Sequence, residues 1–509
     1  MLYSEGYSTG GAEPPRKEQE LSDQNLTLLT DLYELTMMQG YFMSGNNQKV
    51  VFDAFYRDNP CNNGFSICCG LEQVIDYIKN LSFGYDDIAY LRSTGLFTDE
   101  FLDYLRSYHF TGDIYAIPEG TVIFPREPMV KVVAPIMEAQ LVETALLNII
   151  NHQSLIATKS YRVVHAAQGD GVMEFGLRRA QGPDAGLYGA RAAVIAGCIG
   201  TSNVLAGKMF DIPVKGTHAH SWIMSFPDEL TAFRTYAKLY PNAAILLVDT
   251  YDTLRSGVPN AITVFKEMRE AGLPMKGYGI RLDSGDLSYL SKEARRMLDE
   301  AGFTDAIISA SSDLDENLIL SLKSQGAAIN SWGVGTKMIT SYDWAAFGGV
   351  YKLAAVQDPE TGEYTPKIKL SENAGKVTNP GNKTVYRIYD RKTGKIISDL
   401  IALVGEHYSE DEELVLFDPV DTWKKTRLKP GTYAIRELLV PVFVNGICVY
   451  DSPSVMEIQG VCRDELDTLW PETKRLTNPH PVHVDLSRPL YDLKNSILEQ
   501  MNDAKYENA

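Results

Sequence analysis

Short apolar strands alternate with helical stretches over residues 171–356, and this alternation constrains the fold more than any other feature of the chain. The strands are predicted to end at or near Phe175, Gly200, Thr217, Asp249, Asp283, Ser312 and Gly333. Several intervals are close to roughly 30 residues, the size of one βα unit. No GxGxxG opens the first unit. We therefore expect an irregular TIM-like α/β barrel rather than an open doubly wound sheet.

The chain has 509 residues, more than one hydrophobic core usually supports, so several domains are expected. Residues 1–22 are rich in Gly, Pro and charge, which predicts a disordered leader and not a secretory signal. Residues 23–140 are predicted to form an N-terminal α+β domain and residues 141–356 the catalytic barrel. Frequent turn signals in residues 357–509 predict a β-rich accessory region, part of which packs on the N-terminal domain.

Composition limits the partners. A net charge of −18 argues against nucleic acid, which needs a basic face. No apolar run is long enough for a membrane span. The 6 cysteines show no CxxC pair, which indicates reduced thiols and a cytoplasmic location. An acidic chain can still bind an anionic substrate through clustered Arg and Lys or through a metal ion.

Two histidines, His218 and His220, follow a predicted strand and the turn at Gly216 and Thr217. Because its pKa lies near neutrality, a histidine at such a position can act as a base, a metal ligand or a phosphate acceptor. The alternative is that both imidazoles only make supporting hydrogen bonds.

Arg281 and Asp283 alternate on one strand, so both side chains point to the same face. An arginine fork beside a carboxylate suits a phosphate and a sugar diol, although an internal salt bridge is the alternative. Asp249 and Asp313 follow two other strands. Converging carboxylates at such positions can hold Mg²⁺, and each could instead cap a helix.

Two further strand ends suit the rest of an anionic substrate. Gly335 and Thr336 open a helix in a small loop that can cradle a terminal phosphate. Phe175, followed by Arg178, can stack on a flat aromatic acid while the arginine pairs with its carboxylate. The alternative for Phe175 is an ordinary core position.

In order and spacing, these segments resemble nicotinate phosphoribosyltransferase, of the type II phosphoribosyltransferase family and its longer bacterial type. The matching motifs are TDLY at 30–33, EFGLRR at 174–179, GT at 216–217 with AHS at 219–221, RLDSGD at 281–286, GVGT at 333–336, GVYKL at 349–353 and KLSEN at 369–373. The resemblance covers residues 28–387 closely, and the C-terminal region resembles the extra domain of the longer bacterial members.

The resemblance implies an ATP-dependent ligase of NAD salvage that joins nicotinate to phosphoribosyl pyrophosphate, with Mg²⁺ assisting the departure of pyrophosphate. His220 would be phosphorylated by ATP. Phe175 would stack on nicotinate, and Tyr33 of a second subunit would stack on its other face, in a homodimer with shared sites. The implied catalytic residues are His220 and Asp283. The implied substrate-binding residues are Tyr33, Arg57, Phe175, Arg178, Thr217, Arg281, Ser284, Gly285, Gly335 and Thr336.

The resemblance also assigns parts of the substrates. Arg178 and Arg281 would bind carboxylate and phosphates, Asp283 the ribose hydroxyls, and Gly335 with Thr336 the 5′-phosphate. His218 has no place in the family motif, and residues 61–63 read CNN where members usually show FGG.

Three alternatives remain. Nicotinamide phosphoribosyltransferase shares the fold, but its relatives have an Asp where this chain has Ser202, and a neutral side chain does not repel a carboxylate. A quinolinate-using enzyme would need more cations and a shorter chain. A catalytically silent relative would have lost His220 or Asp283, and both are present.

Overall fold

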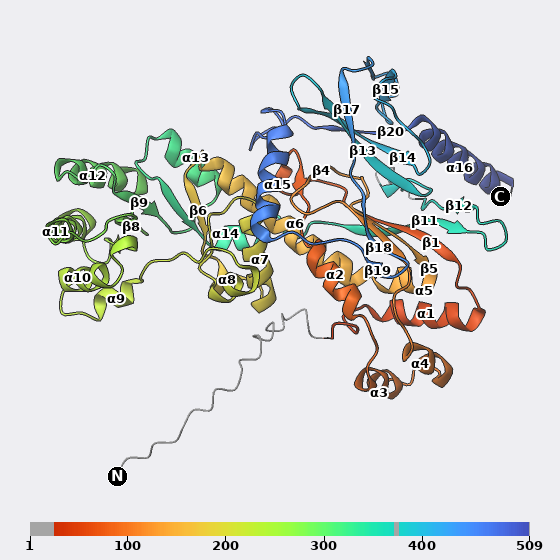
Figure 1. Ribbon diagram of the computed structural model, residues 1–509, viewed down its shortest axis with the longest axis horizontal. Helices are drawn as coiled ribbons and strands as arrows, with labels where there is room; N and C mark the ends of the chain where they lie inside the picture. Colours follow the sequence, from red (N-terminus) through yellow and green to blue (C-terminus); the bar gives the residue numbers. More distant parts are fainter. Residues whose placement is uncertain (1–24, 371–375, 508–509) are drawn as a thin grey trace, which may run out of the picture.

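The computed structural model describes residues 25–370 and 376–507, and its two lobes lie on either side of the long helix α6, Glu143–Ala166 (Figure 1). Helix α6 contains no Gly or Pro and buries most of its second half, so it runs unbroken through the middle of the molecule. The predicted leader at 1–22 and positions 371–373 of the KLSEN motif lie outside the described residues.

One lobe is built on an antiparallel sheet of seven strands, in the order β12-β11-β1-β5-β3-β18-β19. Its N-terminal strands are β1 (Lys49–Phe55), β3 (Asp113–Ala116) and β5 (Val130–Pro135). The others come from later in the chain: β11 (Val350–Gln357), β12 (Tyr364–Pro366), β18 (Val440–Val444) and β19 (Ile447–Cys448). Because β11 pairs with β1 along its length, the domain boundary predicted at residue 356 falls inside a strand of this sheet.

Five helices and a small two-stranded sheet complete this lobe. They are α1 (Leu32–Ser44), α2 (Leu71–Asn80), α3 (Tyr85–Ser93), α4 (Asp99–Leu105), α5 (Ile136–Leu141), β2 (Ser66–Ile67) and β4 (Val122–Ile123).

The other lobe contains a parallel sheet in the order β6-β10-β9-β8-β7. Its strands are β6 (Gly171–Glu174), β7 (Ile245–Leu247), β8 (Gly279–Leu282), β9 (Ile307–Ala310) and β10 (Ser331–Val334). Single bridges from Glu174 to Thr201 and from Thr201 to Val214 extend the sheet beyond β6. The α/β class is therefore confirmed, and strands end close to the predicted positions Phe175, Asp249, Asp283, Ser312 and Gly333. Near Gly200 and Thr217, where strands were also predicted, the structure has only single bridges.

The closed barrel is not confirmed. Within the described chain no backbone ladder joins the segment at Val214 to β7, so the parallel sheet is open between them. A side chain spans this gap instead, because the Leu247 N–H donates a hydrogen bond to Nε2 of His218 at 3.3 Å.

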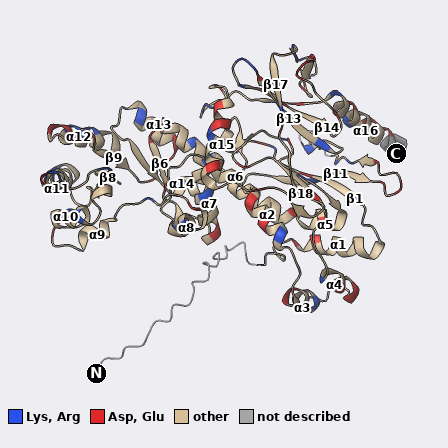
Figure 2. Cartoon of the chain, in the orientation of Figure 1, with Lys and Arg blue, Asp and Glu red and all other residues tan. Residues whose placement is uncertain are grey.

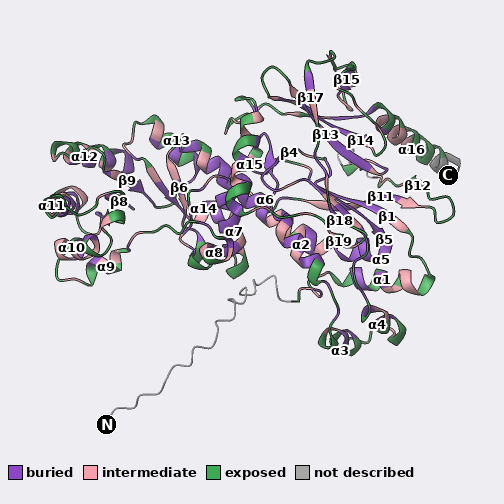
Figure 3. Cartoon of the chain, in the orientation of Figure 1, coloured by how far each residue is buried: buried purple, intermediate pink, exposed green. Residues whose placement is uncertain are grey.

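Helices flank the parallel sheet and present mixed charge to solvent, as they do in the other lobe (Figure 2). They are α7 (Pro183–Ile195), α8 (Val204–Phe210), α9 (His220–Met224), α10 (Glu229–Leu239), α11 (Val258–Glu270), α12 (Leu287–Glu300), α13 (Glu316–Ser324) and α14 (Thr336–Ile339). Asp228, Asp286 and Asp315 cap α10, α12 and α13 by accepting a backbone N–H of the first turn. The strands are largely buried beneath these helices (Figure 3).

The C-terminal region adds a four-stranded sheet in the order β17-β13-β14-β20 and a hairpin of β15 and β16. Its elements are β13 (Lys383–Asp390), β14 (Ile396–Leu403), β15 (Leu414–Phe417), β16 (Lys425–Leu428), β17 (Tyr433–Glu437), α15 (Val455–Thr468), β20 (His483–Leu486) and α16 (Arg488–Glu507). Buried Arg387 pairs with Asp399 at 2.6 Å and with Glu465 at 3.0 Å, which ties β13 to β14 and α15.

None of the helices in the described ranges has the length and apolar character needed to cross a membrane.

Candidate active site

Two adjoining cavities open at the carboxyl ends of the parallel strands. The smaller, of about 320 Å³, is lined by Phe175, Leu177, Arg178, Ser202, Gly216, Thr217, His218, Ala219 and Arg281. The larger, of about 420 Å³, includes His220, Ser221, Asp283, Ser311, Ser312, Asp313, Gly335 and Thr336. Phe175, Arg178 and Arg281 line both cavities, so an aromatic ring and two cations lie where the cavities meet.

Phe175 lies over β10 because glycine occupies position 333. The Phe175 N–H donates to the Val334 carbonyl at 2.8 Å, which continues the ladder between β6 and β10. A Cβ added to Gly333 would lie 2.6 Å from two carbons of the Phe175 ring. The ring can therefore reach this position only over a residue without a side chain.

Arg281 is the more enclosed of the two cations. Its guanidinium donates to Oγ1 of Thr217, and its Nε is buried with no hydrogen-bond partner in the part of the chain that is described. Burial lowers the pKa of Arg281, and the carboxylates of Asp283 and Asp249 oppose that shift. Arg178 lies in the short 3-10 turn Leu177–Arg179 that follows β6. An anionic group between the two arginines would pair with both guanidinium groups.

His220 is the first residue of α9, and its two ring nitrogens face different groups. Nδ1 lies 3.0 Å from Oγ1 of Thr250. Nε2 lies 3.7 Å from Oδ2 of Asp283 and 4.0 Å from Oδ1 of Asp249. The side chain is 37% exposed, so a reactant in the larger cavity can reach Nε2.

The two aspartates have different environments. Oδ2 of Asp249 accepts from the Asp283 N–H at 2.9 Å and from Oγ of Ser284 at 2.7 Å. Its Oδ1 is buried and has no hydrogen-bond partner among the described residues. Asp283 accepts from Oγ of Ser311 and remains partly open to the cavity. Asp249 thus supports the loop that carries Asp283.

That loop needs glycine at position 285. Gly285 has φ of +78°, in the left-handed region that favours glycine, and a Cβ there would lie 2.9 Å from Leu290. Ser284 and Gly285 thus form the turn between β8 and α12, beside the cavity wall that Asp283 provides.

Asp313, Gly335 and Thr336 also line the larger cavity. The ammonium group of Lys337 does not face this cavity unpaired, because its Nζ forms an ion pair with Asp315 at 2.7 Å. No group of three or more His, Cys, Asp or Glu side chains with metal-binding geometry occurs in residues 25–370 and 376–507.

Tyr33 and Arg57 do not line either active-site cavity of their own chain. Tyr33 is on α1 with 46% of its surface exposed, and burial, Glu143 and Glu34 together raise the pKa of its phenol. Arg57 lines a separate cavity with Arg126 and Lys383. A single copy of the chain therefore does not bring these two residues to the other predicted site residues.

His218 is buried and structural in its contacts. Besides accepting the Leu247 N–H, its ring meets Tyr236 edge-on, with ring centroids 4.6 Å apart. Burial first, and then Arg281, lower the pKa of His218 to about 4, so the ring is neutral near pH 7. His218 lines only the smaller cavity and His220 only the larger one, which separates the two histidines that the sequence sets close together.

Two contacts of the site were not predicted. Thr250 holds His220, and Ser311 holds Asp283. Both residues lie at the carboxyl ends of buried strands, so a systematic inspection of every hydroxyl at a strand end could have identified them.

Family models and known proteins match this chain along most of its length. The nicotinate phosphoribosyltransferase N-terminal domain matches residues 28–151, the nicotinate phosphoribosyltransferase family model residues 171–387, and the C-terminal domain residues 382–494. Nicotinate phosphoribosyltransferase of Bacillus subtilis is 46% identical over 96% of this chain and 99% of its own length. An enzyme of the same name from Mycobacterium tuberculosis is 40% identical over 88% of this chain and 89% of its own. The crystal structure of the human nicotinic acid phosphoribosyltransferase superposes with a TM-score of 0.80 at 29% identity, covering 92% of this chain and 99% of that one.

Proposed function

The chain belongs to the nicotinate phosphoribosyltransferase family, and we propose that it joins nicotinate to the phosphoribosyl group of phosphoribosyl pyrophosphate in NAD salvage. The ring nitrogen of nicotinate attacks C1 of the ribose, and the bond from C1 to the pyrophosphate oxygen breaks with its electron pair. The observation that carries the proposal is the junction of two cavities at Phe175, Arg178 and Arg281.

Nicotinate occupies the smaller cavity in this proposal. Its flat ring lies against Phe175, and its carboxylate pairs with Arg178 and Arg281. Ser202 and Thr217 line the same cavity and are neutral, which suits a carboxylate. The alternative substrate, nicotinamide, carries no charge to balance the two guanidinium groups.

Phosphoribosyl pyrophosphate occupies the larger cavity. The carboxylate of Asp283 accepts the ribose hydroxyls, while Gly335 and Thr336 contact the 5′-phosphate. Ser284 and Gly285 hold the turn behind Asp283. In this proposal, C1 of the ribose lies at the junction of the cavities, next to the nicotinate ring on Phe175.

We propose Mg²⁺ as the metal ion and Asp249 and Asp313 as the residues that would hold it. The donor chemistry fits, because Asp249 has a buried, unpartnered Oδ1 and Asp313 lines the substrate cavity in the described chain. Mg²⁺ in proteins is usually held by one or two carboxylates together with substrate phosphates. When bound, it would offset the charge of the departing pyrophosphate.

ATP enters the proposal as a co-substrate that phosphorylates His220. If Nδ1 donates its proton to Oγ1 of Thr250, the lone pair of Nε2 faces the larger cavity. Nε2 then attacks the γ-phosphorus, an N–P bond forms, and the bond to the ADP oxygen breaks. This chemistry would place the enzyme in the ATP-dependent ligase class.

We also propose a homodimer with shared active sites, in which Tyr33 and Arg57 of one subunit complete the site of the other. The support is that Tyr33 lies in the TDLY motif at 30–33 and that both residues lie away from the cavities of their own chain. The 6 cysteines are all free, which supports a location in the reducing cytoplasm.

The test is an assay of the purified chain with phosphoribosyl pyrophosphate, Mg²⁺ and either nicotinate or nicotinamide. We expect nicotinate mononucleotide as the product, with turnover stimulated by ATP. Turnover of nicotinamide without turnover of nicotinate would refute the substrate, and a lack of any product would favour a silent relative. His220→Ala should abolish labelling by γ-phosphate-labelled ATP.

A further inference from the structure

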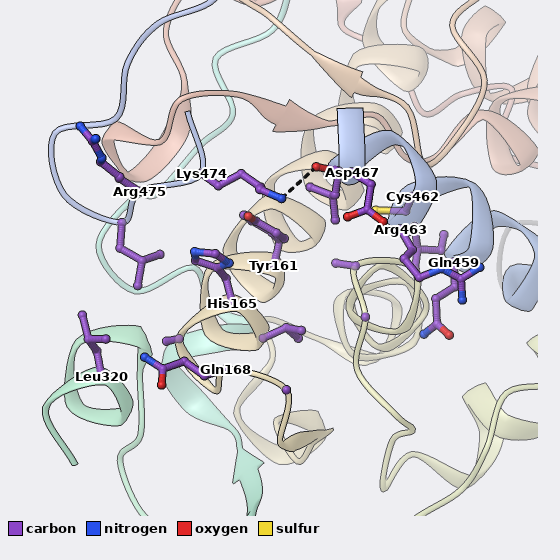
Figure 4. A pocket seen from close by; sticks show the side chains of 18 of the residues that line it. Tyr161, His165, Gln168, Leu320, Gln459, Cys462, Arg463, Asp467, Lys474 and Arg475 are labelled. Carbon is purple, nitrogen blue, oxygen red and sulfur yellow. Dashed lines mark hydrogen bonds between the residues drawn. The ribbon is translucent and has the colours of Figure 1, made fainter. Parts of the chain in front are cut away.

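A cavity of about 830 Å³, larger than either active-site cavity, lies at the opposite end of the parallel strands (Figure 4). It is enclosed by the second half of α6, the ends of α7 and α15, α13, and residues 474–477. Gln168 and Gly169 in its wall lead into the amino end of β6, whereas Phe175 follows the carboxyl end. None of the residues proposed for catalysis or substrate binding lines it.

The wall of this cavity offers a flat aromatic surface. Tyr161 and His165, on successive turns of α6, stack with ring centroids 5.4 Å apart and planes 24° apart. Apolar side chains of Val164, Ile195 and Leu466 surround them. The hydroxyl of Tyr161 is buried and makes no hydrogen bond within the described residues. A ligand with a flat ring would pack against the exposed ring of His165.

Three cations and one carboxylate line the cavity, namely Arg463, Lys474, Arg475 and Asp467 (Figure 4). Arg463 also pairs with Asp464 at 3.4 Å and Arg475 with Glu472 at 3.9 Å, and both pairs are exposed and therefore weak. Nζ of Lys474 donates to the Leu466 carbonyl at 3.2 Å, which holds the ammonium at the wall. Burial lowers the pKa of Lys474. In a chain of net charge −18, the Lys474 ammonium and two weakly paired guanidinium groups in one wall favour an anionic ligand.

Helix α13 links this cavity to the active site. Leu320 of α13 lines the cavity. At the start of the same helix, Glu316 accepts from Nζ of Lys159 at 2.9 Å and from Nε of Arg162 at 2.8 Å, both on α6. Asp313, in the loop just before α13, lines the larger active-site cavity. A ligand that separates α6 from α13 would therefore act on the loop that carries Asp313.

We propose that this cavity binds an organic anion of about mononucleotide size, with a flat aromatic ring and a phosphate or sulfonate group, and that binding changes catalytic turnover through α13. The volume is within the range of about 300–1,000 Å³ typical of small-molecule sites. The binding part of the proposal needs no catalytic activity. Only the coupling part rests on the proposed function.

Binding is tested with anilinonaphthalene sulfonate, a flat aromatic anion that fluoresces in apolar sites, and with adenosine monophosphate as its competitor. We expect one saturable site on the full chain, from which adenosine monophosphate displaces the dye more strongly than adenosine or inorganic phosphate does. The double variant Lys474→Gln with Arg475→Gln should weaken dye binding about tenfold or more. Leu320→Trp, at a position 39% exposed, should weaken it by filling the cavity.

Two controls separate this cavity from other sites. Lys266→Gln removes an exposed charge on α11 and should leave dye binding unchanged. Arg281→Gln disables the anion pocket of the active site and should also leave it unchanged. The proposal is overturned if no saturable site is found, if the double variant binds as the parent does, or if Arg281→Gln alone abolishes binding.

Coupling is tested by kinetics with nicotinate. Adenosine monophosphate should change the turnover of the parent chain, and this change should vanish in the double variant, whose basal turnover is retained. Binding of the dye without any such change would overturn the coupling and leave the binding site standing. A chain inactive with nicotinate would refute the proposed function, while the dye measurements would still decide the binding site.

Discussion

Replacing Thr250 with valine tests whether the ring of His220 is held for phosphorylation. Valine has the shape of threonine but lacks the hydroxyl that lies 3.0 Å from Nδ1 of His220. Because the histidine side chain is 37% exposed, water can replace part of this interaction, and the loss is within the usual range of about 0.5–1.5 kcal/mol. If the bond holds the reactive orientation, transfer of the γ-phosphoryl group to Nε2 slows by roughly 2- to 13-fold.

The measurement is the rate at which γ-phosphate-labelled ATP gives acid-labile label on the protein, followed after rapid quenching. Turnover with nicotinate in the absence of ATP is measured beside it and should be unchanged, because Thr250 does not line the substrate cavities. Thr250→Ser keeps the hydroxyl and should label at nearly the parent rate.

Two results would refute this reasoning. Labelling of Thr250→Val at the parent rate would mean that the hydrogen bond does not orient the ring. Equal losses of labelling in the valine and serine variants, together with a loss of turnover in the absence of ATP, would mean that any substitution disturbs the loop and that the hydroxyl has no specific role.

Three further predictions concern the smaller cavity and its walls. Ser202→Asp places a second carboxylate beside the carboxylate of nicotinate and should raise the KM for nicotinate about tenfold. Ser202→Asn adds no charge and should leave that KM nearly unchanged. An unchanged KM in the aspartate variant would contradict the assignment of nicotinate to the smaller cavity. The added methyl group in Gly333→Ala displaces the Phe175 ring, at an overpacking cost of about 1–3 kcal/mol, and should raise the KM for nicotinate. The control Gly460→Ala, whose methyl group enters open space, should leave this KM unchanged. The pKa of His218 is lowered to about 4 in the folded chain, against about 6.5 in the unfolded chain. The unfolded state therefore takes up a proton first as the pH falls, and the free energy of unfolding decreases between about pH 6.5 and 4. In urea unfolding, the free energy of unfolding of His218→Gln should therefore decrease less over that pH range than that of the parent chain. An equal decrease in both would contradict a buried, neutral His218 ring.

Much of the active site could be predicted because its residues follow strand ends. Apolar runs such as residues 245–248 identify buried strands locally, and parallel strands bring their carboxyl ends to one edge. Asp283, Arg281, Phe175 and Thr336 were therefore expected to lie together, and the cavities bring them together. Their individual roles in binding and catalysis stay predictions.

The pairing of distant strands could not be predicted in the same way. Strand β11 follows the parallel strands in the chain and shares their apolar character, yet it pairs with β1 in the other sheet. Register depends on contacts between residues about 300 positions apart, which no local pattern encodes. The domain boundary at residue 356 was placed from local turn signals and so falls within this strand.

The order of strands and helices and the kinds of side chain at each strand end follow from local patterns, because hydrophobic period and turn residues act over a few positions. No local pattern encodes that the sheet is open between Val214 and β7, that His218 spans the gap, or that Nε2 of His220 faces Asp283. Those outcomes depend on which distant atoms meet, since a hydrogen bond forms only within a few tenths of an ångström of its proper length.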